Sequence, residues 1–76
     1  MKNRVKEIRT QLGLTQQQLA DRVHATSRTI ISIEKGQYNP SLLLAYRISL
    51  ALGLPVQELY CLQENMEDED RLQSQQ

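Results

Sequence analysis

The segment TSRTIISIEKG, residues 26–36, is predicted to form a helix with two unlike faces. At about 100° per residue, Ile30 and Ile33 share one side and can join an apolar core. The side chains on the outer side and its flank are Arg28, Ile31, Ser32 and Lys35. An arginine can donate two hydrogen bonds to guanine O6 and N7, a serine pairs with several base edges, and an alkyl group can contact a thymine methyl. With a lysine for a phosphate, this face carries chemistry that fits the major groove of DNA.

A polar outer face on a short helix is, by itself, usually no more than a solvated surface, and an exposed isoleucine is common. The preceding element favours the DNA interpretation. Residues 15–23 are predicted to form a second short helix. A turn of three or four residues around HAT connects it to the helix at residues 27–35. The small residue Ala20 lies where the two helices would cross. Two short helices joined in this way are the helix-turn-helix arrangement, whose second helix enters the major groove.

The rest of the chain also reads as short helices. Apolar residues recur at the spacing of one helix face between residues 2 and 12, and Gly13 follows as a stop signal. Thr15 and Gln18 have the spacing of a capping box at the start of the next helix. Further helices are predicted over the ranges 15–23, 27–35, 41–52 and 56–62. No segment alternates clearly enough to predict a strand, so the expected fold class is all-α, a compact five-helix domain.

Charge is distributed unevenly along this chain of 76 residues, whose formal net charge is zero. Residues 1–57 carry eight basic and three acidic side chains, a net charge of +5, and residues 58–76 carry one basic and six acidic side chains, a net charge of −5. Such asymmetry suggests a polyanionic partner for the basic part, although a charge of +5 also fits a solvated surface. We expect a domain of residues 1–63, followed by an acidic, Gln-rich, flexible tail of residues 64–76.

The composition indicates a small soluble protein of the cytoplasm. The chain has no Trp and no Phe, so the core must be aliphatic, and the single Cys61 cannot form an internal disulfide. The first ten residues, MKNRVKEIRT, lack the apolar stretch of a signal peptide, and no run approaches the ~18 apolar residues of a membrane span.

Residues 12–60, about two-thirds of the chain, resemble the DNA-binding domain of the lambdoid phage repressor and Cro group, the Xre family. The similarity rests on LTQQQLA, on SRTIISIEKG at 27–36, and on NPSL before the fourth predicted helix. The resemblance implies a lambda-repressor-like fold with a helix-turn-helix formed by helices 2 and 3. It also implies a sequence-specific regulator that binds double-stranded DNA, most simply a repressor that acts as a homodimer on a near-palindromic operator.

The resemblance also assigns roles to individual residues. The positions that read bases in the family, together with the flanking alkyl group, are occupied here by Ser27, Arg28, Thr29, Ile31 and Ser32. The positions near DNA phosphates are occupied by Gln16, Lys35, Tyr38 and Asn39. In the family the glutamine also braces the recognition helix, and a simple turn role fits the tyrosine and the asparagine nearly as well. Arg9 and Glu34 match a structural pair that bridges helix 1 to the recognition helix, and the helical wheel turns Glu34 inward.

Two further features concern the turn and the dimer. The family often has glycine in the turn where this chain has His24, which accepts positive φ better than a branched residue but with some strain. In relatives, the fourth and fifth helices form the dimer surface. The apolar residues expected there are Leu50, Leu54, Val56, Leu59 and Tyr60, unless they complete the core of the monomer.

The function could also be that of an antitoxin or adaptor, whose acidic tail binds a basic protein partner while the same domain binds its own operator. An enzyme is not expected, because one His, one Cys and three Gly leave no nucleophile–base set and no phosphate-binding loop. No cofactor and no metal site are expected, since the lone histidine lacks neighbouring ligands and the EDED run lacks fixed spacing.

Overall fold

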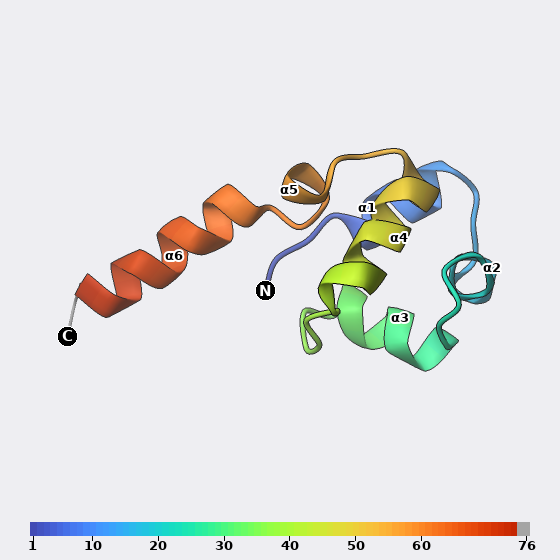
Figure 1. The fold of residues 1–76 in the computed structure, drawn as a ribbon, viewed down its shortest axis with the longest axis horizontal. Coiled ribbons are helices and arrows are strands. Elements are labelled where there is room, and N and C mark those ends of the chain that lie inside the picture. Colours follow the sequence, from blue (N-terminus) through green and yellow to red (C-terminus); the bar gives the residue numbers. More distant parts are fainter. Residues whose placement is uncertain (75–76) are drawn as a thin grey trace.

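The computed structural model describes residues 1–74, which form six α-helices and no strand (Figure 1). The helices are α1 (Val5–Gln11), α2 (Gln16–Arg22), α3 (Ser27–Glu34), α4 (Leu42–Leu52), α5 (Val56–Leu59) and α6 (Leu62–Ser74). The first five form a rounded body, and α6 projects from one side of it (Figure 1). The all-α class predicted from the sequence is confirmed, with one helix more than expected. None of the described helices is both long enough and apolar enough to cross a membrane.

Capping side chains set the starts of the three middle helices. Thr15 and Gln18 form the capping box that the sequence predicts: the threonine Oγ1 accepts from the Gln18 N–H at 3.0 Å, and the Gln18 side chain accepts from the Thr15 N–H at 2.9 Å. Thr26 accepts from the backbone N–H of Thr29 at the start of α3. Ser41 likewise accepts from the N–H of Leu44 at the start of α4. These bonds satisfy amide donors that a helix start leaves without a backbone partner.

The core is aliphatic, with one tyrosine. Its buried members are Val5, Ile8, Leu19, Ala20, Val23, Ile30, Ile33, Ala45, Ile48, Leu52, Leu59 and Tyr60. They come from all five helices of the body and from the residues that end α2 and α5. Ala20 is completely buried, and its small side chain lets α2 approach α3 closely, as predicted.

The first helix begins at Val5, three residues later than the sequence predicts. Residues 1–4 form an arm that is bound to distant parts of the chain. The Arg4 N–H donates to the Leu59 carbonyl oxygen at 2.7 Å, and the Lys2 N–H donates to Asn65 Oδ1 at 3.1 Å. These tertiary bonds hold the arm alongside α5 and the start of α6 and keep it out of α1.

The expectation of a flexible tail was wrong for residues 64–74, because Leu62–Ser74 form α6; the last two residues of the expected tail, 75 and 76, lie outside the described part of the chain. Local pairs support this helix: Gln63 donates to Glu67 at 2.8 Å, and Arg71 donates to Asp68 at 2.7 Å. Asn65, in its first turn, binds the N-terminal arm and fixes the start of the helix. The expected domain boundary at residue 63 falls inside α6, and a division of the chain there stays a prediction.

Candidate nucleic-acid interface

The second helix of the helix-turn-helix unit is α3, and its outer side faces away from the core. Ile30 and Ile33 are completely buried, which fixes the rotation of the helix about its axis. Arg28 is exposed, whereas the other residues predicted to read bases are half-buried: Ser27, Thr29, Ile31 and Ser32. The Thr29 hydroxyl lies 3.0 Å from the Thr26 hydroxyl, so it forms part of the helix cap.

The turn between α2 and α3 depends on a residue in the left-handed region. His24 has a φ of 59°, so the turn position at which the family often has glycine does adopt a positive φ in this chain. The chain then reverses over Ala25, whose N–H donates to the Ala20 carbonyl oxygen at 3.0 Å. Residues other than glycine rarely adopt this conformation, so the turn carries backbone strain.

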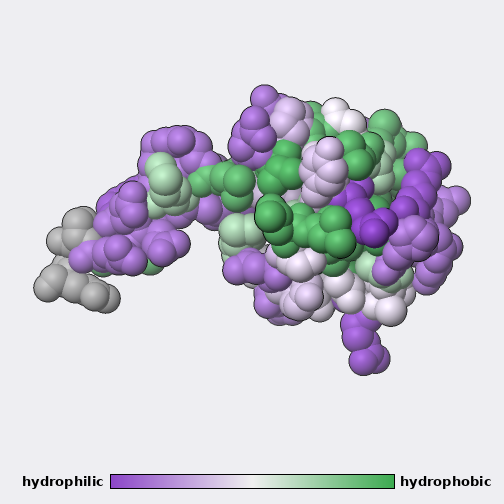
Figure 2. Space-filling model, viewed as in Figure 1, coloured by the Kyte–Doolittle hydropathy of each residue, from purple (hydrophilic) through white to green (hydrophobic). Residues whose placement is uncertain are grey.

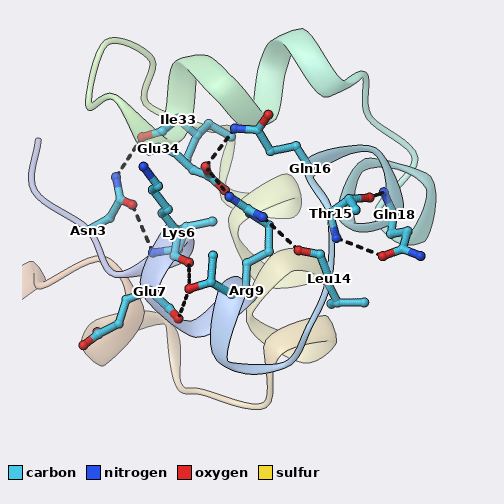
Figure 3. A network of polar contacts seen from close by, with 12 residues as sticks. Asn3, Lys6, Glu7, Arg9, Leu14, Thr15, Gln16, Gln18, Ile33 and Glu34 are labelled. Atoms are coloured by element: carbon cyan, nitrogen blue, oxygen red, sulfur yellow. Dashed lines mark hydrogen bonds and ion pairs between the residues drawn. The ribbon is translucent and has the colours of Figure 1, made fainter.

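A buried polar network holds the inner side of α3 (Figure 3). Arg9 Nε donates to Glu34 Oε2 at 2.6 Å, and its second terminal nitrogen, Nη2, donates to Glu34 Oε1 at 3.1 Å. Arg9 Nη1 donates to the Leu14 carbonyl oxygen at 2.8 Å, and Gln16 Nε2 donates to Glu34 Oε1 at 3.1 Å. The Arg9 and Glu34 side chains are only 9% and 3% exposed. The network therefore ties α1, the loop before α2, and α2 to the end of α3.

Gln16 contributes to this network from the first turn of α2. Its amide nitrogen is bound to Glu34, so the side chain braces α3 in the way that the resemblance implies. Its contact with a DNA phosphate stays a prediction. Lys35 is the C-cap of α3, and Tyr38 and Asn39 are exposed in the loop that follows. The structure thus places three of the four residues predicted at phosphates next to one end of α3.

The end of α3 has a second support, which the sequence analysis missed. Asn3 Nδ2 donates to the Ile33 carbonyl oxygen at 2.8 Å, and the Met1 ammonium donates to the Gly36 carbonyl oxygen at 3.1 Å. The Ile33 carbonyl oxygen also accepts from the Gly36 N–H at 2.9 Å, so Asn3 is a second donor to it at the end of the helix. Asn3 Oδ1 also accepts from the Val5 N–H at 3.1 Å, so an asparagine two residues before an apolar helix was the available sequence signal.

The outer face of α3 is positively charged. The only acidic residue in this helix is Glu34, and its carboxylate is buried against the Arg9 guanidinium. Arg28 and Lys35 therefore remain as exposed cations with no acidic neighbour on the same helix. Such a surface attracts a polyanion and suits an electrostatic contact with the DNA backbone. Among the described residues, no three His, Cys, Asp or Glu side chains are grouped so as to hold a metal ion.

The predicted dimer surface is partly wrong. Leu59 and Tyr60 are 0% and 1% exposed, because they complete the core of their own chain beside the N-terminal arm. Leu54 and Val56 are half-buried at the edge of that core. Leu50, by contrast, is 64% exposed.

The exposed apolar residues of α4 are more numerous than expected. On this helix, Leu50 shares one outer face with Leu42, Leu43 and Tyr46, all of which are more than half exposed. Apolar side chains gather over α4 and α5 on the side of the molecule shown in Figure 2. Leu42, Leu43, Tyr46 and Val56 line a groove there whose walls are almost entirely apolar. We call it the α4 groove.

Comparison with known proteins places the chain in a family. The helix-turn-helix family profile matches residues 5–59. The chain is 48% identical over 66 residues to an uncharacterized HTH-type transcriptional regulator of Methanothermobacter thermautotrophicus, which covers 86% of this chain and 96% of that protein. It is 34% identical over 68 residues to the competence pilus inhibition repressor of Acinetobacter baylyi, covering 90% of this chain and 62% of that protein.

Among solved structures, the restriction-modification controller protein C.AhdI of Aeromonas hydrophila is similar, with a TM-score of 0.70 and 33% sequence identity. That similarity covers 75% of this chain and 86% of the controller protein. The fold, the helix-turn-helix geometry and these relatives agree. The chain belongs to the Xre-type helix-turn-helix family of DNA-binding transcriptional regulators.

Proposed function

We propose that this chain is a cytoplasmic, sequence-specific repressor that binds a near-palindromic operator as a homodimer. The observation that carries the proposal is the exposed Arg28 guanidinium on a helix whose opposite side is locked by the Arg9–Glu34–Gln16 network. A base-reading arginine must be held in a fixed position to discriminate one base pair from another. The rigid inner side of α3 meets that need. A relative named as a repressor supports repression over activation.

In this proposal, α3 lies in the major groove with its N-terminal half toward the bases. Arg28 forms a bidentate contact with a guanine, and the half-buried residues Ser27, Thr29, Ile31 and Ser32 determine the neighbouring base pairs at short range. Gln16 and Lys35 contact phosphates on either side of the groove, and Tyr38 and Asn39 extend that contact beyond the end of α3. Phosphate contacts position the domain, and base contacts select the sequence.

The homodimer supplies the second recognition helix. Two such helices must lie about 34 Å apart, one turn of DNA, to read successive major grooves on one side of the duplex. The outer face of α4 supports the homodimer, because exposed side chains such as Leu42 and Leu50 form a patch that a monomer has no reason to leave in water. In a twofold dimer each copy covers this patch of the other copy, and the twofold symmetry accounts for the near-palindromic operator.

Binding to labelled duplex DNA tests the proposal. The duplexes are the region upstream of the protein's own gene and a scrambled duplex of the same composition, and binding is measured across salt concentrations. We expect a preference for the upstream region of about 10³ or more. Arg28→Ala should lose about 1–3 kcal/mol of that preference, or roughly 5–150-fold. Arg71→Ala, which removes the same charge from α6, is the matched control. Equal, weak and salt-sensitive binding of both duplexes by the wild type would contradict a sequence-specific function.

A further inference from the structure

The sixth helix leaves the body in a direction that its first turn fixes. Asn65 Oδ1 accepts from the Lys2 N–H at 3.1 Å, and its Nδ2 donates to the Lys2 and Tyr60 carbonyl oxygens at 2.9 and 2.8 Å. An ion pair of 2.7 Å between Lys2 Nζ and Glu64 adds to this clamp. As a result α6 points away from the body, and the described part of the chain is 42 Å long but only about 20 Å across (Figure 1).

Three apolar side chains lie toward one side of this projecting helix, and its own chain leaves them uncovered. Leu62, Met66 and Leu72 fall within an arc of about 120° on the helical wheel, which they share with Asn65, Glu69 and Gln73. They are 40%, 50% and 66% exposed. The main packing partner of α6 within the chain is α5, beside its first turn. Met66 and Leu72, which lie beyond that first turn, can therefore be buried only against another surface.

The α4 groove is a surface of matching character. Its walls are almost entirely apolar, and Leu42 and Leu43 at its rim are 83% and 61% exposed. The 13 residues of α6 span about 20 Å, and the 11 residues of α4 span about 16 Å, so the two helices can lie alongside each other over most of their length. The clamp at Asn65 directs α6 away from the groove of its own chain, which leaves the groove of another molecule.

Charge indicates which molecule that is. Helix α6 contains five acidic residues and one arginine, a net charge of −4, whereas residues 1–61 contain eight basic and four acidic residues, a net charge of +4. Two α6 helices side by side would bring −4 against −4. An α6 helix on the body of a second copy brings opposite charges together. The exposed Arg47 follows Tyr46 in α4, and Tyr46 lines the groove. Such complementarity favours the second arrangement.

We propose that α6 is an exchanged arm, which lays Met66 and Leu72 into the α4 groove of a second copy of this chain. In a twofold dimer the contact occurs twice, once for each arm. This inference rests on the homodimer in the proposed function, and it adds the element that closes the dimer. It gives the acidic helix a role in assembly that is separate from contact with DNA, from which its negative charge would repel it.

A mixed disulfide tests the contact directly. Two proteins carry Cys61→Ser, so that no native thiol remains. One also carries Leu72→Cys and a mass tag, and the other carries Leu42→Cys. After mixing and oxidation with glutathione disulfide, we expect a disulfide-linked heterodimer between positions 72 and 42. The matched control moves the arm cysteine to the opposite side of α6 as Glu67→Cys, and this variant should cross-link at least tenfold more slowly. Predominant linkage of Leu72→Cys to itself would show paired α6 helices and overturn the proposal.

Sedimentation equilibrium of full-length variants separates this inference from the proposed homodimer. Replacing Met66 and Leu72 together by serine should raise the dimer dissociation constant at least tenfold, whereas Gln63→Ser, on the flank of the same helix, should leave it unchanged. If the wild type dimerises and the double variant has the same dimer dissociation constant, the arm contact is overturned and the homodimer is not affected. A monomeric wild type would overturn both. Circular dichroism confirms that each variant keeps its helices.

Discussion

The Arg9 guanidinium and the Glu34 carboxylate form a bidentate ion pair between α1 and α3, with N–O distances of 2.6 and 3.1 Å. Neither side chain is more than a tenth exposed. Arg9 also binds the Leu14 carbonyl oxygen, and Glu34 also accepts from Gln16. Because each charged group has further partners, the pair fixes the position of α3 as well as contributing to the fold.

Removal of one member of this pair should be costly. Glu34→Ala leaves the Arg9 guanidinium buried without its counter-charge, and we expect a loss of about 3–5 kcal/mol in the free energy of unfolding, measured with urea. The double variant Arg9→Met with Glu34→Leu leaves no uncompensated charge and should lose much less. The exposed pair of Arg4 and Glu7 is the control, since Glu7→Ala should change stability little. A single variant as stable as the double variant would show that the pair is not a coupled unit.

Backbone strain at the turn of the helix-turn-helix predicts a stabilising substitution. His24 holds a φ of 59°, which glycine adopts without a Cβ clash. His24→Gly should therefore gain about 1 kcal/mol, which raises the thermal midpoint of a domain of this size by roughly 4–8 °C. His24→Ala should gain nothing. The reverse change at Gly53, which has a φ of 73° and open space for a Cβ, should lose about 1 kcal/mol as Gly53→Ala. A lower midpoint for His24→Gly would mean that the imidazole makes a stabilising contact worth more than the strain.

Local signals in the sequence predicted the starts of α2, α3 and α4 and the inward face of α3 well. Threonine and serine caps act on amides only two or three residues away, so a capping box such as Thr15 with Gln18 can be read from spacing alone. The buried position of Glu34 followed from helical periodicity. These features need no knowledge of the rest of the fold.

The errors concern features that depend on distant contacts. Helix α6 formed where a flexible tail was expected. Its start is fixed by the hydrogen bond between Lys2 and Asn65, which are 63 residues apart in the chain. Leu59 was expected at a dimer surface, but the N-terminal arm binds its carbonyl oxygen and helps to enclose it in the core. Helix α4 is apolar on both sides, with Ile48 inward and Leu50 outward. Periodicity alone cannot tell which of two apolar sides faces the core of the same chain.

The buried Tyr60 should make the stability of the fold depend on pH in the alkaline range. Burial raises the pKa of its hydroxyl from 10.0 to about 12, and this hydroxyl is a buried group for which the described residues provide no hydrogen-bond partner. Below pH 10 the tyrosine keeps its proton in both states. Above pH 10 it ionises in the unfolded chain first, so unfolding releases a proton and stability falls as pH rises toward 12.

Tyr60→Phe should remove this part of the pH dependence. It also removes a buried polar group without a partner, so we expect a gain of about 1–3 kcal/mol at neutral pH. Urea unfolding between pH 7 and 11 measures both effects. Tyr38→Phe is the control, because Tyr38 is 47% exposed and should change neither quantity appreciably. An unchanged slope above pH 10 in Tyr60→Phe would assign the alkaline loss of stability to other groups.

Lys35 predicts a salt effect that differs from the effect of Arg28. As the exposed C-cap of α3, it lies beside the loop that carries Tyr38 and Asn39, where a phosphate contact is proposed. Each neutralised phosphate contributes about −0.9 to the slope of log affinity against log salt concentration. Lys35→Ala should therefore make the slope shallower by about one and weaken binding to the upstream region and to scrambled DNA by the same factor. Arg28→Ala should instead reduce the ratio of the two affinities, because a bidentate base contact distinguishes sequences. A loss in Lys35→Ala that is confined to the upstream region would make Lys35 a base-reading residue and would place the end of α3 closer to the bases than we propose.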